Sequence, residues 1–154
     1  MSTRSRIGIA QDDGTVKSIY CHWDGYPSNN GKILLDHYTD RTKVESLIAL
    51  GDISALEAEV APTEELAPGR YSDTKKPVRH SFDTPQENVT IAYARDRGED
   101  FEEVKPRIDE SVAAFEKSDL EEWGYLFKDG KWLVKGCCDK KFVPLTEKFC
   151  LERG

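Results

Sequence analysis

The segment Tyr20–Pro27, with the sequence YCHWDGYP, organises the rest of this chain. It combines three aromatic rings with an imidazole, a thiol and a carboxylate, and it ends in a Gly and a Pro that turn the chain. Strands inside a core seldom carry such a mixture, because buried polar groups need partners. We therefore expect a strand that leaves the core here and becomes a site.

Residues 5–23 are predicted to form a β-hairpin around Gln11–Gly14, where Gly14 is free to adopt positive φ. Side chains on the return strand alternate between its two faces. The face predicted to turn toward the core carries Ile19, Cys21 and Trp23. The opposite face carries Ser18, Tyr20 and His22.

Helices are predicted over residues 31–38, from a cap at Asp40 to a stop at Gly51, and from Pro106 to about residue 118. Later strands are predicted over residues 88–94, 123–127, 131–134 and 142–150. The element order, ββαα, a loop, then βαβββ, indicates a single α+β domain over residues 1–154. Its antiparallel sheet should carry helices mostly on one face.

Residues 57–87 interrupt this pattern, because their prolines break any period. We predict a long surface excursion with one short element, since loops of this length are uncommon in compact domains. Its stretch Arg79–Asp83 can fold back over a site.

The composition of the chain limits the classes of partner that it is expected to bind. A net charge of −7 disfavours binding to nucleic-acid duplexes and to anionic membranes, and it is compatible with a basic protein partner. No apolar run approaches about 18 residues, and no hydrophobic stretch follows Met1–Arg6, so a cytoplasmic location is expected. The cysteines Cys21, Cys137, Cys138 and Cys150 form no disulfide framework and lack zinc-site spacing, so neither metal nor cofactor is predicted.

The rings of the opening segment can stack on a base or on another ring, and its polar groups can form hydrogen bonds. Two arginines at the end of the 88–94 strand can clamp a phosphate, or they can neutralise the acids beside them. The residues predicted to bind a ligand or partner are Tyr20, His22, Trp23, Asp24, Tyr26, Arg95 and Arg97. This set suits a nucleotide-like small molecule or a protein hot spot. Trp23 taken alone also fits a core residue at a strand end.

An alternative is catalysis, with His22 as acid or base and Asp24 orienting it. Cys21 points away from His22 on a strand, and the sequence has no serine nucleophile elbow, phosphate-binding glycine loop or histidine metal motif. Binding is therefore favoured over catalysis.

The chain resembles a family of small proteins common in bacteriophage and prophage genomes. The matching motifs are Ser5-Arg6-Ile7, Asp13-Gly14, Ile19–Tyr26, Asn30-Gly31, Leu34-Leu35, His37-Tyr38, Val44, Leu47-Ile48, Leu50–Ser54, Tyr93–Glu99, Tyr125–Phe127 and Gly130–Trp132. The resemblance implies a phage accessory protein in the bacterial cytoplasm, and it supplies no catalytic residues.

These observations favour a non-enzymatic phage protein that inhibits host anti-phage defence. It would either bind a host protein or sequester a nucleotide-type signal, and docking on a protein demands less of the local geometry. The alternatives are a small nucleotide hydrolase that uses His22 and Asp24, and a virion or structural accessory protein.

Overall fold

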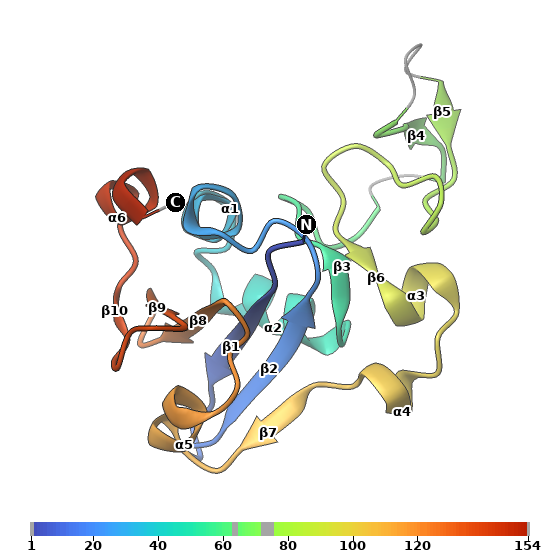
Figure 1. The fold of residues 1–154 in the computed structure, drawn as a ribbon. Helices are drawn as coiled ribbons and strands as arrows, with labels where there is room; N and C mark the ends of the chain where they lie inside the picture. The colour runs from blue at the N-terminus through green and yellow to red at the C-terminus, as the bar shows by residue number, and fades with distance from the viewer. Residues whose placement is uncertain (1, 63–64, 72–75, 154) are drawn as a thin grey trace.

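The computed structural model describes residues 2–62, 65–71 and 76–153. Within them, eight strands form one sheet in the order β10-β9-β8-β1-β2-β3-β6, with β7 also paired to β2 (Figure 1). These strands are β1 (Ser5–Ala10), β2 (Val16–Cys21), β3 (Ile53–Ala55), β6 (Ile91–Ala92), β7 (Arg107–Asp109), β8 (Trp123–Lys128), β9 (Lys131–Gly136) and β10 (Val143–Pro144). The predicted α+β class is therefore confirmed.

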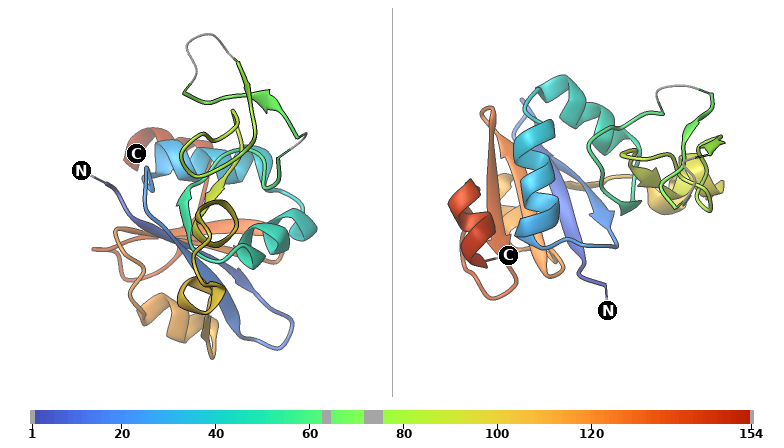
Figure 2. Two further views of the ribbon diagram at one scale, coloured as in Figure 1. Left: turned by 90° about the vertical axis from the view of Figure 1, so that its right-hand side faces the viewer. Right: turned by 90° about the horizontal axis from the view of Figure 1, so that it is seen from above.

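The helices are η1 (Pro27–Gly31), α1 (Lys32–His37), α2 (Arg41–Ala49), α3 (Tyr93–Arg97), α4 (Phe101–Val104), α5 (Val112–Lys117) and α6 (Glu147–Arg153). A separate pair of short strands, β4 (Ala67–Pro68) and β5 (Pro77–Val78), projects from the body of the molecule (Figures 1 and 2). No helix of the described residues is long and apolar enough to span a membrane.

Two hairpins form the centre of the sheet, as the sequence predicts. The β1–β2 hairpin turns through Gln11–Gly14, and the β8–β9 hairpin turns through Asp129 and Gly130 at positive φ. The hairpins join through a parallel pairing of β1 with β8, and β2 also runs parallel to β3. The sheet is thus mixed rather than wholly antiparallel. The β1–β8 register aligns Ile7 with Tyr125 and so continues one apolar face across both hairpins.

The larger core lies on that face. Its buried side chains come from the strands and from α1, α2 and α6, including Ile7, Ile19, Leu34, Leu47, Phe127 and Cys150. A smaller core on the other face contains Val16, Phe115 of α5, Leu120 and Leu126. Helices therefore cover mostly one face, as expected, and α6 lies beside α1 (Figure 2).

The helix over residues 41–49 begins and ends where the sequence predicts. The Asp40 carboxylate accepts a hydrogen bond from the Thr42 amide at 3.3 Å, and Gly51 has a φ of +78°. These two end signals are local, so they do not depend on the rest of the fold.

Three boundaries differ from the predictions because tertiary contacts override the local pattern. The 88–94 strand is reduced to β6, because the Asp96 carboxylate accepts the Ala92 amide at 2.7 Å and the chain turns into α3. No helix begins at Pro106; residues 107–109 pair with β2 instead, and α5 starts after a Ser111 cap. The predicted strand over residues 142–150 contains only β10, followed by α6.

The loop after β2 is fixed against the core at Gly25. Its amide donates to the Thr3 carbonyl at 2.8 Å, and its carbonyl accepts the Tyr125 hydroxyl at 2.6 Å. A Cβ atom at this position would lie 2.7 Å from the Ser5 Cβ and 2.9 Å from the Thr3 carbonyl oxygen. Only glycine fits this approach without a shift of the backbone.

Replacing Gly25 with Ala is expected to lower the free energy of unfolding by about 1–3 kcal/mol, the usual cost of forcing a methyl group into a packed site. Urea unfolding followed by circular dichroism measures this. In a double-mutant cycle, Ser5→Gly should recover part of the cost, because it removes the side-chain atoms that the new methyl meets. If the free-energy changes of Gly25→Ala and Ser5→Gly were strictly additive in the double variant, the new methyl group would not clash with the Ser5 side chain.

Candidate functional site

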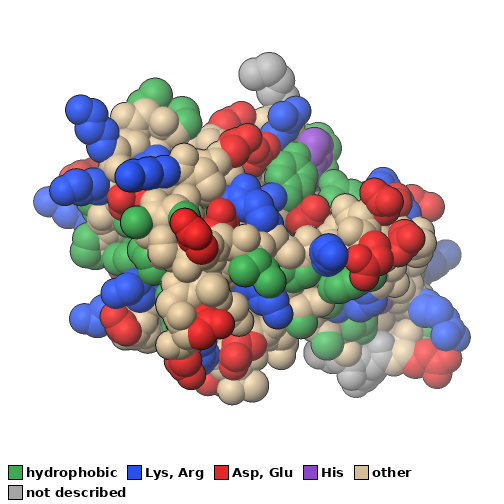
Figure 3. Space-filling model, turned by 90° about the horizontal axis from the view of Figure 1, so that it is seen from below, with side chains coloured by type: hydrophobic (Ala, Val, Ile, Leu, Met, Phe, Trp, Pro, Cys, Tyr) green, Lys and Arg blue, Asp and Glu red, His purple; other side chains and the backbone are tan. Residues whose placement is uncertain are grey.

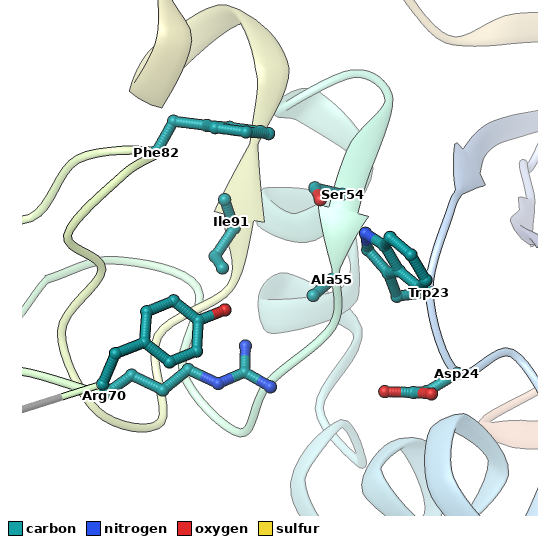
Figure 4. A pocket seen from close by; sticks show the side chains of 8 residues that line it. Trp23, Asp24, Ser54, Ala55, Arg70, Phe82 and Ile91 are labelled. Carbon is teal, nitrogen blue, oxygen red and sulfur yellow. The ribbon is translucent and has the colours of Figure 1, made fainter. Parts of the chain in front are cut away.

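A cavity of about 370 Å³ opens beside the loop that follows β2. Strands β3 and β6 contribute Ser54, Ala55 and Ile91, and the 57–87 excursion closes the remaining wall (Figure 4). The lining residues are Trp23, Asp24, Ser54, Ala55, Arg70, Tyr71, Phe82 and Ile91. Two of the residues predicted from the opening segment, Trp23 and Asp24, therefore meet at one cavity.

Trp23 lies on the cavity wall rather than in the core, so the prediction from strand alternation is wrong for this residue. The amides of His22 and Trp23 both donate to β3, to the carbonyls of Ile53 and Ser54 at 3.2 and 2.9 Å. In a regular strand, consecutive amides point to opposite sides, so this pairing breaks the alternation after Cys21. Cys21 stays buried, whereas Trp23 is 45% exposed.

The imidazole of His22 packs against the indole of Trp23. The two rings meet edge to face with centroids 4.8 Å apart, and the other side of His22 is held by Tyr20, whose hydroxyl lies 2.8 Å from Nδ1. Tyr20 and His22 thus stand behind Trp23 and do not line the cavity. His22 pairs with Tyr20 rather than with Asp24. Tyr26 is half-buried at the start of η1, also outside the lining.

Opposite charges face each other across the cavity. Figure 4 shows the Arg70 guanidinium and the Asp24 carboxylate pointing toward one another from opposite sides. Arg70 is paired with Glu57 at 3.1 Å, yet its Nη1 is buried and finds no hydrogen-bond partner among the described residues. Burial raises the pKa of Glu57 despite the attraction of Arg70, and the nearby Asp24 carboxylate raises it further.

The excursion is attached to α3 through a buried histidine. His80 Nδ1 accepts the Gln86 amide at 3.0 Å, so Nε2 carries the proton and donates to Asp96 Oδ2 at 3.1 Å. The side chains of His80 and Asp96 are each only 3% exposed. The Phe82 amide also donates to the Asp96 carbonyl, which brings the Phe82 ring to the cavity. Residues 79–83 thus fold back toward the loop after β2, as the sequence allows, and Phe82 is their contribution to the cavity lining.

The two predicted arginines of α3 do not line the cavity. Arg95 donates to the carbonyls of Val60 and Thr90 at 2.6 and 2.7 Å and pairs with Asp96. Arg97 pairs with Glu99 at 2.7 Å, and its guanidinium lies over the Phe82 ring at 4.6 Å. Both serve the packing of the excursion on α3, which matches the alternative that they neutralise neighbouring acids.

Arg70 and Tyr71 are the cavity residues that sequence reasoning missed. They lie in the proline-interrupted excursion, where no periodic pattern shows which side chains return to the body of the molecule. The available signal was an arginine next to an aromatic residue, directly after Pro68 and Gly69. Ile91 belongs to the predicted 88–94 strand, and the sequence predicted no strand over Ser54 and Ala55, so none of the three indicated a site.

Comparison of the chain with models of protein families, with curated proteins and with solved structures finds no match. Across residues 2–62, 65–71 and 76–153, no three His, Cys, Asp or Glu side chains gather in a way that could hold a metal ion.

Asp96→Asn is expected to lower the free energy of unfolding by about 1–3 kcal/mol at pH 7, because the buried carboxylate accepts several hydrogen bonds. Burial alone would raise the pKa of Asp96, but hydrogen bonds from Arg95 and Ala92 outweigh it and lower the pKa. The stabilisation is therefore complete above the ordinary aspartate pKa of about 3.9 and is lost as pH falls through the lower folded value. Urea unfolding between pH 7 and pH 2 measures this. The difference in free energy of unfolding between Asp96→Asn and the unmodified protein should become smaller as the pH falls.

Asp83→Asn is the control for this series, because Asp83 lies in the excursion that Asp96 holds in place, but is itself exposed. It should change the free energy of unfolding by less than about 0.5 kcal/mol at every pH. A gap for Asp96→Asn that stays constant down to pH 2 would contradict the assigned role of the carboxylate.

Proposed function

We propose that this protein binds a nucleotide-type small molecule in the cavity and sequesters it without chemical change. As a phage accessory protein, it would thereby withhold a signal from the anti-phage defence of its bacterial host. The observation that carries the proposal is the cavity itself, where the exposed rings of Trp23 and Tyr71 lie in one lining with the guanidinium of Arg70.

The aromatic lining suits a flat ligand. Trp23 and Tyr71 are 45% and 68% exposed, and large rings in contact with water at a cavity mouth are available for stacking. Base–aromatic stacking contributes about 1–3 kcal/mol per base and tolerates different bases. The volume of about 370 Å³ lies within the range of small-ligand sites and suits a single nucleotide unit.

The charges around the cavity favour a ligand with one phosphate group. The Arg70 guanidinium points into the cavity and can donate to a phosphate oxygen, and Asp24 can accept from a ring N–H, an exocyclic amine or a ribose hydroxyl. Asp24 and Glu57 together place two carboxylates against one guanidinium. This local excess of negative charge disfavours a triphosphate, because each added phosphate charge is repelled.

Other observations support binding over the alternatives. His22 is engaged by Tyr20 and Trp23 rather than by Asp24, which does not favour a His22–Asp24 catalytic pair. On the face shown in Figure 3, acidic side chains are interspersed with lysines and arginines rather than gathered into a single patch for a basic groove. The phage setting rests on the resemblance of the Cys21–Tyr26 motif and its companions.

Ligand retention tests the proposal directly. The protein is incubated with nucleoside monophosphates, cyclic nucleotides, dinucleotides and triphosphates, freed of unbound compound, denatured, and its extract identified by mass spectrometry. We expect one monophosphate or cyclic compound to be recovered intact in a stoichiometric amount, and triphosphates to be retained least. A chemically altered product would indicate a hydrolase, and the failure to retain any of these compounds would overturn the proposal in favour of a protein target.

Trp23→Ala and Arg70→Ala should each weaken binding of the retained compound about fivefold or more, measured by calorimetry, because stacking and a charge-assisted hydrogen bond each contribute more than about 1 kcal/mol. Trp23→Phe should keep most of the affinity. Arg79→Ala is the matched control, since Arg79 belongs to the same excursion but is 73% exposed and pairs with Glu65. Unfolding of Trp23→Ala would instead assign Trp23 a structural role.

A further inference from the structure

Two adjacent thiols occupy the turn that follows β9. The Asp139 amide donates to the Gly136 carbonyl at 3.0 Å, so Cys137 and Cys138 are the central residues of a four-residue turn. Adjacent side chains on a strand point to opposite faces, but this turn brings the two sulfur atoms to 3.7 Å. Both cysteines are exposed and free.

The backbone of this turn is held from both sides. The Cys137 amide donates to the Glu122 carbonyl at 3.0 Å, and the Gly136 amide donates to Asp139 Oδ2 at 2.9 Å. Arg153 of α6 donates to both oxygens of Asp139 at 3.3 and 3.1 Å. The thiols are therefore presented at a fixed place on the surface, in contact with each other.

We propose that Cys137 and Cys138 form a reversible oxidation site, which closes into a disulfide between adjacent residues on reaction with a hydroperoxide. One thiol loses its proton, and the thiolate attacks an oxygen of hydrogen peroxide. The O–O bond breaks to give a sulfenic acid, and the leaving hydroxide takes up that proton as water. The second thiol attacks the sulfenic sulfur, the S–O bond breaks, and the disulfide and a second water form. Two thiols are oxidised and one peroxide is reduced.

The geometry makes this disulfide easy to reduce again. Ordinary disulfides join Cα atoms about 4.4–6.8 Å apart, whereas neighbouring Cα atoms across a trans peptide are about 3.8 Å apart. A ring closed at that separation is strained, and strained, exposed disulfides are the labile ones. The same pair also favours an internal disulfide over a bond to another chain, because each thiol already contacts its partner.

The two remaining cysteines differ in kind. Cys21 and Cys150 lie in the core, 0% and 2% exposed. Buried thiols of this kind are inert toward oxidants. The turn also lies on the side of the sheet away from the β4–β5 pair (Figure 1), and neither cysteine lines the cavity.

Intact-mass and peptide mass spectrometry after treatment with equimolar hydrogen peroxide test the proposal, with remaining thiols alkylated before digestion. The expected result is a loss of about 2 Da, located in the peptide that holds Cys137 and Cys138 and reversed by dithiothreitol. Cys21 and Cys150 should be recovered alkylated after denaturation. Cys137→Ser and Cys138→Ser should each abolish the mass loss, and circular dichroism should show both variants folded.

The other outcomes overturn the proposal. Disulfide-linked dimers would show that the thiols react between chains. Sulfinic acid at either position, without a disulfide, would show that the pair cannot close. If Cys21 or Cys150 were oxidised earlier than Cys137 and Cys138, the exposure of the two turn thiols and their mutual contact would not determine which cysteines react.

Discussion

The close approach of Gly25 to the first strand is the constraint on which the candidate site depends. Because position 25 has no side chain, the loop after β2 can lie against Thr3 and Ser5, and the buried Tyr125 hydroxyl fixes its carbonyl from the core side. Asn30 strengthens the same junction by donating to Ser5 Oγ and to the Cys21 sulfur. Trp23 and Asp24 then project from a loop whose two ends cannot move independently. Several residues of this segment thus have a structural role, and Trp23 and Asp24 line the cavity.

The opposite wall of the cavity is built in a different way. The described part of the 57–87 excursion has little regular structure, and it is tied to α3 by side-chain hydrogen bonds and one backbone hydrogen bond rather than by a sheet. Asp96 is central to this attachment, since it accepts from His80, Arg95 and the Ala92 amide, while its carbonyl accepts the Phe82 amide. One wall therefore depends on steric fit and the other on a buried polar network, which is stable only when fully satisfied. A substitution in the Asp96 network can therefore detach the excursion while the loop after β2 stays in place.

The sequence predicted the features that are encoded locally. Both hairpins have glycine turns, and the helix over residues 41–49 carries its own end signals, so neighbouring residues suffice to define them. The failures have tertiary causes. Residues 107–109 become a strand because β2 offers a free edge, and Tyr93 starts a helix because Asp96 reaches back to Ala92. For the site, a dense motif singled out Trp23 and Asp24. Arg70 could not be found, because its position depends on how the excursion folds back.

The order of the strands also bears on how copies of this protein meet. A sheet can recruit a neighbouring chain only through an edge with unpaired backbone groups. Within the described residues, the path of the sheet ends at β6 and β10, each two residues long, and Pro144 of β10 has no amide hydrogen to offer. The long strands are interior, and the outer side of β2 is shared by β7, by the Asp52 carboxylate on the Tyr20 amide, and by β3. The described sheet therefore ends in short edge strands, which offer few consecutive unpaired backbone groups for edge-to-edge polymerisation.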